Sequence, residues 1–132
     1  MKISNIIFCG NAINVEGEGV KAEHIFSSLT PNYIPGLFSF SVIAIILGID
    51  SNVEHDILIE FCSPEDEKLV VVCGKSPKLE NTTNLPAEHK GLNIAMNWQN
   101  VNFKTSGLYT LKITVDKEYV GAKEIYVKGL NE

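Results

Sequence analysis

The amino-acid sequence predicts an all-β domain, a two-sheet antiparallel sandwich of about seven or eight strands with at most one short helix. Three observations predict this class. Apolar and polar residues alternate along several segments, and β-branched and aromatic residues are common within these segments. Gly, Pro, Asn and Asp residues separate the segments, as expected of turns between short strands.

The clearest pair of strands is predicted near the carboxyl end. Within residues 107–116 every second side chain is apolar: Tyr109, Leu111, Ile113 and Val115. Since side chains alternate across a strand, this face packs on a core while the other mostly meets water. Residues 116–118 supply a turn, and residues 119–128 return as the second strand of a hairpin.

A second hairpin is predicted in the middle of the chain. Ile57, Ile59 and Phe61 alternate with more polar positions, residues 63–67 form an acidic turn, and residues 68–75 return as a strand. Cys62 then lies beside the turn, while Cys73 lies several residues along the partner strand. A disulfide needs the two Cβ atoms about 4 Å apart, so this pair is not expected to form one.

A third long strand carries the single tryptophan. One face contains Leu92, Ile94, Met96 and Trp98. The apolar phase then moves to odd positions at Val101 and Phe103, as one extra residue would cause, which predicts a bulge or a break near residues 99–100. This register makes Trp98 a core residue; the alternative is an exposed platform that stacks on a sugar.

The amino-terminal half is less regular. Residues 3–15 read as a long strand, whose alternation places Ile3, Ile7, Ile13 and Val15 on one face. Residues 16–19 form a flexible turn, and residues 21–29 fit either a short helix or a second strand. Residues 76–90, with two prolines, are the longest irregular segment, of the kind that is often functional or mobile.

Residues 37–49 begin with alternation and become apolar on both faces from Ile43 to Leu47. A strand buried on both sides needs a cover, which is either another segment of this chain or a second subunit. Residues 21–29 offer about four apolar positions for that purpose, so the sequence favours a symmetric homodimer. The predicted self-association residues are Ile43, Ile45, Ile46 and Leu47.

Composition narrows the class of protein. A chain of 132 residues with 45% hydrophobic residues fits a single domain, residues 1–132. The net charge of −5, without a Lys/Arg cluster, argues against nucleic acid as a partner. The longest uninterrupted apolar stretch is too short for a membrane span, and the amino terminus lacks a secretion signal. We therefore expect a cytoplasmic protein with no membrane partner.

Candidate metal ligands are scattered. The cysteines and histidines are Cys9, Cys62, Cys73, His24, His55 and His89. Three cysteines are an odd number without a secretion signal, which indicates reduced thiols. No two of these six residues have the short spacing of structural zinc motifs, so we expect no metal and no cofactor.

Carboxylates and serines give no catalytic signature. Residues 65–67 are acidic and could contribute oxygens to Ca²⁺ if Asp50, Glu54 and Asp56 lay nearby, although a solvated turn is the ordinary interpretation. His55 stands between two acidic residues, but adjacent strand residues point to opposite faces and form no relay. No G-x-S-x-G elbow is present, and we identify no catalytic residue.

The segment 102–115, with Gly107 and Tyr109 as a Gly-x-Tyr at the start of a strand, resembles the penultimate strand of many immunoglobulin-like sandwiches. The order of elements over residues 53–127 is similar to that of small bacterial and phage-associated β-sandwich domains of unknown function. The resemblance implies an immunoglobulin-like layout and supplies no functional residue.

These observations together predict a non-catalytic interaction module that binds protein, including a second copy of itself as a homodimer. A small-ligand or carbohydrate-binding β-sandwich module is the alternative function. An uncharacterised enzyme ranks third among the possible functions, because no catalytic constellation supports it.

Overall fold

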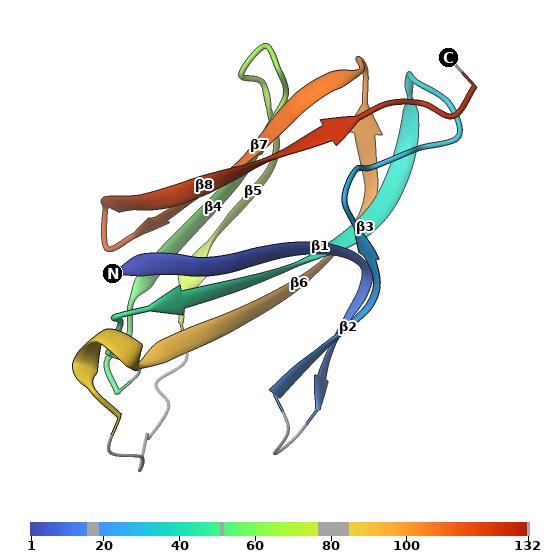
Figure 1. Ribbon diagram of the computed structural model, residues 1–132. Helices are drawn as coiled ribbons and strands as arrows, with labels where there is room; N and C mark the ends of the chain where they lie inside the picture. The colour runs from blue at the N-terminus through green and yellow to red at the C-terminus, as the bar shows by residue number, and fades with distance from the viewer. Residues whose placement is uncertain (16–18, 51, 77–84, 132) are drawn as a thin grey trace.

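The computed structural model describes residues 1–15, 19–50, 52–76 and 85–131, and over these ranges the chain forms eight strands and one short 3₁₀ turn (Figure 1). The elements are β1 (Lys2–Val15), β2 (Gly19–Phe26), β3 (Gly36–Leu47), β4 (Asp56–Cys62), β5 (Lys68–Lys75), η1 (Ala87–His89), β6 (Gly91–Phe103), β7 (Gly107–Val115) and β8 (Glu118–Val127). Within the described ranges no helix is long and apolar enough to cross a membrane.

The strands form two four-stranded antiparallel sheets that face each other. The first sheet has the order β2-β1-β3-β6 and the second the order β5-β4-β7-β8 (Figure 1). The predicted all-β sandwich and its number of strands are therefore confirmed. Residues 77–84 of the predicted irregular segment and residues 16–18 of the predicted turn lie outside the described residues.

Both predicted hairpins are confirmed. In the carboxyl-terminal one, β7 and β8 are joined by Asp116 and Lys117, which have φ values of 51° and 66°. Two consecutive positive φ values are the signature of the two-residue hairpin turn whose twist matches that of the strands. In the other hairpin, the Ser63 side chain accepts a hydrogen bond from the Glu67 amide at 3.0 Å, which closes the acidic turn.

The space between the sheets is filled by aromatic rings. The buried rings belong to Phe8, Phe40, Phe61, Trp98, Phe103 and Tyr109. Trp98 is 8% exposed and meets the ring of Phe40 edge-on, with centroids 5.4 Å apart. The Tyr109 hydroxyl donates a hydrogen bond to the Thr105 carbonyl at 2.7 Å, which satisfies its one buried polar group. The prediction of Trp98 as a core residue is confirmed.

The bulge predicted near residues 99–100 is also confirmed. Phe40 pairs with Trp98 and Phe38 with Val101, so two residues of β6 oppose the single residue Ser39. The extra residue, Asn100, has a φ of 55° and donates its amide to the Ser39 hydroxyl at 2.9 Å. The change in apolar phase along the sequence is therefore the direct mark of this bulge.

The face predicted for the first strand is wrong. The alternation of the sequence suggests one face made of Ile3, Ile7, Ile13 and Val15. The pairing of β1 with β3 shifts register between Ile3 and Asn5, so that Ile6 and Phe8 point into the core and Ile7 points outward. One extra residue near the start of β1 moves the side chains of the following residues, Asn5 to Cys9, to the opposite face from the one expected.

The outer face of the first sheet is covered by the chain itself. Residues 21–29 do not form a helix, because most of them belong to strand β2, which pairs with β1. Although β3 lies between β1 and β6, the Asn97 side chain on β6 exchanges two hydrogen bonds of 3.2 Å with the Ala12 backbone on β1. The β1–β2 hairpin therefore bends over β3, where Ala12, Cys9 and Ile43 are buried together.

The sandwich is closed on the side where β8 lies near β1. Residues after β2 run along β8, where Leu29 donates to the Tyr126 carbonyl at 3.0 Å and accepts from the Lys128 amide at 3.1 Å. The Lys123 ammonium also donates to the Ile6 carbonyl at 2.7 Å, which joins the two sheets. On the opposite side, between β5 and β6, a groove separates the two sheets.

Candidate functional site

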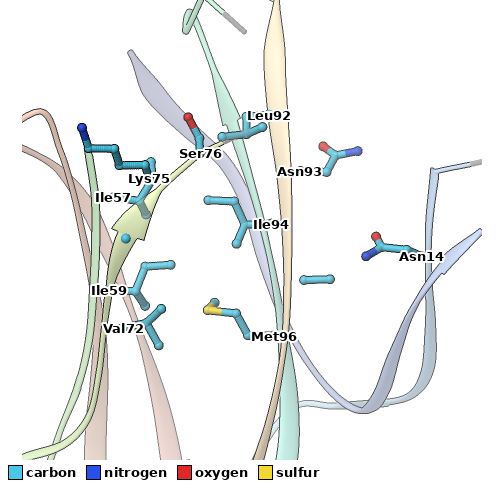
Figure 2. Close-up of a pocket in the computed structure, with 12 residues that line it drawn as sticks. Asn14, Ile57, Ile59, Val72, Lys75, Ser76, Leu92, Asn93, Ile94 and Met96 are labelled. Carbon is cyan, nitrogen blue, oxygen red and sulfur yellow. The ribbon is translucent and has the colours of Figure 1, made fainter. Parts of the chain in front are cut away.

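An apolar groove of about 310 Å³ opens between the two sheets on the side of β5 and β6 (Figure 2). Both strands are the last in their sheets on this side. The large apolar side chains that line the groove are Ile57, Ile59, Val72, Leu92, Ile94 and Met96. The close-up shows those of β6 pointing across the gap toward Ile57, Ile59 and Val72.

Successive side chains of a strand point to opposite faces, and the apolar residues at every second position point into the groove. The deeper ones, such as Ile59 and Leu92, are buried, whereas Val72, Ile94 and Met96 nearer the mouth are only half-buried. All of them belong to the core-facing phase of their strands. Because neither β5 nor β6 has a further strand beside it among the described residues, core-type side chains stay accessible here.

The rim of the groove is polar, and its one charged side chain among the described residues is that of Lys75. The others are Asn14, Asn93 and Ser76, and no acidic side chain lines the groove among the described residues. This is notable in a chain that has 16 acidic and 11 basic residues. Ser76 exchanges hydrogen bonds of 2.9–3.0 Å with the backbone of His55, which fixes this end of β5.

A second hollow, of about 650 Å³, lies on the outer face of the first sheet. It is lined by Ile45, Leu47, Val15 and Val20, and shares Asn14, Leu92 and Asn93 with the groove.

This hollow bears on the predicted self-association residues. Ile46 is 0% exposed in the core between the sheets, and Ile43 is 3% exposed beneath the β1–β2 hairpin. Ile45 and Leu47 are half-buried and line the outer hollow. Only these last two are therefore placed to touch a second molecule without a change in the fold.

A further polar cluster ties together the loops at one end of the second sheet. The Nδ1 atom of His55 lies 2.6 Å from Asp116 Oδ2, and Nε2 lies 2.7 Å from the carbonyl oxygen of Asp50. Asp116 Oδ1 also accepts the Asp56 amide at 2.9 Å. Both ring nitrogens of His55 thus face acceptors, and only the doubly protonated imidazolium can donate to both.

The electrostatics of this cluster follow from its geometry. The hydrogen bond to Asp116 raises the pKa of His55 above its ordinary value of 6.5, and the carbonyl of Asp50 adds to this effect. The hydrogen bonds from His55 and from the Asp56 amide lower the pKa of Asp116. The sequence does not reveal the pair, because its members are 61 residues apart. Both ring nitrogens are engaged, so the cluster serves as a clamp between loops.

We expect the His55 clamp to make stability depend on pH. Since the folded-state pKa of His55 is raised, its contribution is complete below pH 6.5 and is lost as pH rises through the folded-state value. A His55→Gln variant should therefore be destabilised most at pH 5–6 and least at pH 9, as measured by urea unfolding. His89→Gln, at an exposed histidine, is the control. An equal loss at both pH values would contradict a charged clamp.

The acidic turn does not gather with the other carboxylates considered for Ca²⁺. Asp66 and Glu67 form ion pairs of 3.2 Å with Lys112 and Lys104. Asp56 begins β4, whereas the turn follows its last residue, so the length of the strand, about 20 Å, separates the two groups. The hypothesis that Asp50, Glu54 and Asp56 join the turn in one site is therefore wrong.

The cysteines are also apart from one another. On the β4–β5 hairpin, Cys62 lies opposite Lys68 and Cys73 lies opposite Leu58, so the two thiols do not share a register position. Cys9 belongs to β1 in the other sheet, where it is buried together with Ala12 and Ile43. In the part of the chain that the structure describes, no three His, Cys, Asp or Glu side chains are placed to share a metal ion.

Comparisons with known proteins identify the family but no function. Among curated proteins, no match to the chain was found. A family model described as a family of unknown function (DUF6941) matches residues 5–128, so the chain belongs to this family.

Proposed function

We propose that this domain is a non-catalytic interaction module that binds a segment of a partner protein in the groove between β5 and β6. The observation that carries the proposal is that core-type side chains of both sheets, including Val72 and Met96, stay accessible at this side. Burying apolar surface contributes about 25 cal/mol per Å², so a partner that covers these side chains gains binding free energy. On the opposite side, Leu29 and Lys123 provide an internal closure.

We also propose an immunoglobulin-like layout for the sandwich. With β1, β3 and β6 taken as strands A, B and E, and β4, β5, β7 and β8 as C, C′, F and G, the pairing order matches that layout, and β2 is an addition. The Tyr109 hydroxyl bond to Thr105, at the start of the penultimate strand, matches the tyrosine corner of such domains. The bacterial or phage-associated origin implied by the resemblance stays a prediction.

A cytoplasmic location remains part of the proposal. It is supported by three free thiols, of which Cys9 and Cys62 are buried. Burial raises the pKa of both thiols, which keeps them in the unreactive protonated form.

The alternative, a carbohydrate-binding module, has less support. Sugar sites rely on exposed aromatic rings, and the lining of the groove is aliphatic. Trp98, the platform considered from the sequence, packs against Phe40 instead. A small apolar ligand would suit the same groove, and the test below separates it from a peptide.

Self-association is a second candidate function, favoured by Ile45 and Leu47 in the outer hollow. Light scattering on the purified protein checks it directly. A dimer at micromolar concentration that becomes a monomer on Leu47→Lys would support it, and a monomeric wild type would contradict it.

The binding proposal is tested by selecting peptides from a random library against the purified domain. We expect selected peptides to bind the wild type and to lose about tenfold or more in affinity to Met96→Lys, because the new charge lies in the apolar groove. Leu108→Lys, on the outer face of the second sheet and 48% exposed, is the matched control and should bind normally.

Two outcomes would contradict this proposal. One is a set of selected peptides whose affinity does not depend on Met96. The other is a small apolar molecule that copurifies with the domain, occupies the groove and is lost from Met96→Lys, which would favour the small-ligand alternative.

A further inference from the structure

The first half of β6 has a free edge that lies between two apolar hollows. Within the described residues, β6 pairs with β3 alone. On one side of β6 is the groove between the sheets, and on the other is the outer hollow that contains Ile45 and Leu47. Leu92 and Asn93, consecutive residues of β6 that Figure 2 labels in the groove, also line the outer hollow. The unpaired edge is therefore the boundary between them.

We propose that β6 accepts an added antiparallel strand from a partner protein, and that this strand carries apolar residues at consecutive positions. The inference rests on the proposed function and specifies its mode of binding. An edge strand offers backbone N–H and C=O groups that an extended segment can satisfy. Successive side chains of that segment would point alternately into the groove and into the outer hollow.

Strand β3, which pairs with the other edge of β6, already has the pattern that we expect of the added strand, with apolar side chains on both faces. In β3, Val42, Ala44 and Ile46 face the core, whereas Ile43, Ile45 and Leu47 face the outer side. A strand added to the other edge of β6 meets the same two environments, since Ile94 and Met96 lie on its core side. An ordinary amphipathic strand would instead place polar side chains in one of the hollows.

The charges around the hollows indicate how the added strand ends. Their charged or titratable lining residues are Lys75 and His89, and no acidic residue lines either hollow among the described residues. Lys75 lies at the end of the groove where β6 begins (Figure 2). An antiparallel strand brings its carboxyl end to this point. We therefore expect an acidic side chain or a terminal carboxylate there, next to Lys75.

A second copy of this chain fits the site less well. Its edge strand β6 has Asn93 and Asn97 on the outer face, and these would lie against the apolar part of the outer hollow, formed by Ile45 and Leu47. Its edge strand β5 is apolar on both faces but has Lys68 and Lys75 at its ends, so one lysine would approach Lys75 of the first copy. Like charges at that position disfavour pairing with either of these two strands, and we take a different protein as the occupant.

The test uses a short synthetic peptide with valine and isoleucine at consecutive positions, lysines at its amino end and aspartate at its carboxyl end. Binding is measured by fluorescence anisotropy with the full chain. Two further peptides are N-methylated at alternate residues, one in each phase. Because only every second N–H of an added strand faces β6, methylation in one phase should abolish binding and in the other should leave it nearly unchanged.

Variants of the domain then test each hollow and the charged end. Met96→Lys and Leu47→Lys should each weaken binding by about tenfold or more, and Leu108→Lys should not. Lys75→Glu should weaken binding of the peptide that carries aspartate at its carboxyl end. A peptide with lysine in place of that aspartate should instead bind Lys75→Glu more tightly than it binds the wild type. Thermal unfolding of each variant confirms that it is folded.

Three outcomes would overturn the inference. If both N-methylated peptides bind alike, side chains enter the groove without strand pairing, and only the proposed function survives. If Leu47→Lys binds normally while Met96→Lys does not, the outer hollow takes no part. If the wild type is a dimer that dissociates on Met96→Lys, the occupant is a second copy of the chain.

Discussion

Ile46→Lys should unfold the domain, whereas Ile45→Lys, one position earlier on the same strand, should leave it folded. Ile46 is 0% exposed between the sheets, and a lysine there would be a buried charge without a partner. Such substitutions cost several kcal/mol, against a total stability of about 5–15 kcal/mol for a domain of this kind. Ile45 is half-buried at the outer hollow, where the long side chain of a lysine can reach water.

The measurement is circular dichroism with urea unfolding of both variants beside the wild type. We expect no cooperative transition for Ile46→Lys and a loss of at most about 1–2 kcal/mol for Ile45→Lys. The pair is its own control, because the two positions share a strand, a residue type and the new charge. Equal destabilisation of the two variants would contradict the assignment of Ile46 to the core face and Ile45 to the outer face of β3.

Strands and turns were predictable because their signals are local. The alternation from Tyr109 to Val115 predicts β7, and the change of phase after Trp98 predicts the bulge at Asn100. In each case the residues concerned are neighbours in the sequence, and the physical cause is the two-residue period of a strand. The sandwich class follows from several such segments in succession.

The cover over β3 was not predictable, because it depends on a contact between distant residues. The bend of the β1–β2 hairpin is held by Asn97 and Ala12, which are 85 residues apart. The shift near Asn5 has no counterpart in the hydrophobic pattern, since Ile3, Ile6 and Ile7 are all isoleucines. A sequence of equivalent apolar residues does not specify which of them faces the core.

The groove between β5 and β6 could not be predicted from the sequence for a related reason. Its lining residues, such as Ile59 and Ile94, look in the sequence like ordinary core positions. They become accessible because β5 and β6 end their sheets on the same side of the sandwich. That arrangement is a property of the strand order, which alternation does not encode. Of the four predicted self-association residues, the sequence likewise could not separate Ile45 and Leu47 from the two that are buried.

Phe61→Ala should strongly destabilise the domain. Phe61 is 0% exposed, and its ring lies within 5.4–6.3 Å, between centroids, of five others. The rings around it belong to Phe8, Phe40, Trp98, Phe103 and Tyr109. Because these rings come from both sheets, removing Phe61 leaves a cavity that neither sheet can fill alone.

The expected loss is about 3–5 kcal/mol in the free energy of unfolding, and Phe61→Leu should lose less because it leaves a smaller cavity. Urea unfolding measures both, and the emission of Trp98 reports on the same cluster because its ring lies 5.9 Å from that of Phe61. Leu108→Ala, at an exposed site on β7, should cost less than about 1 kcal/mol. A loss for Phe61→Ala no larger than that of Leu108→Ala would mean that the two sheets do not pack through this ring cluster.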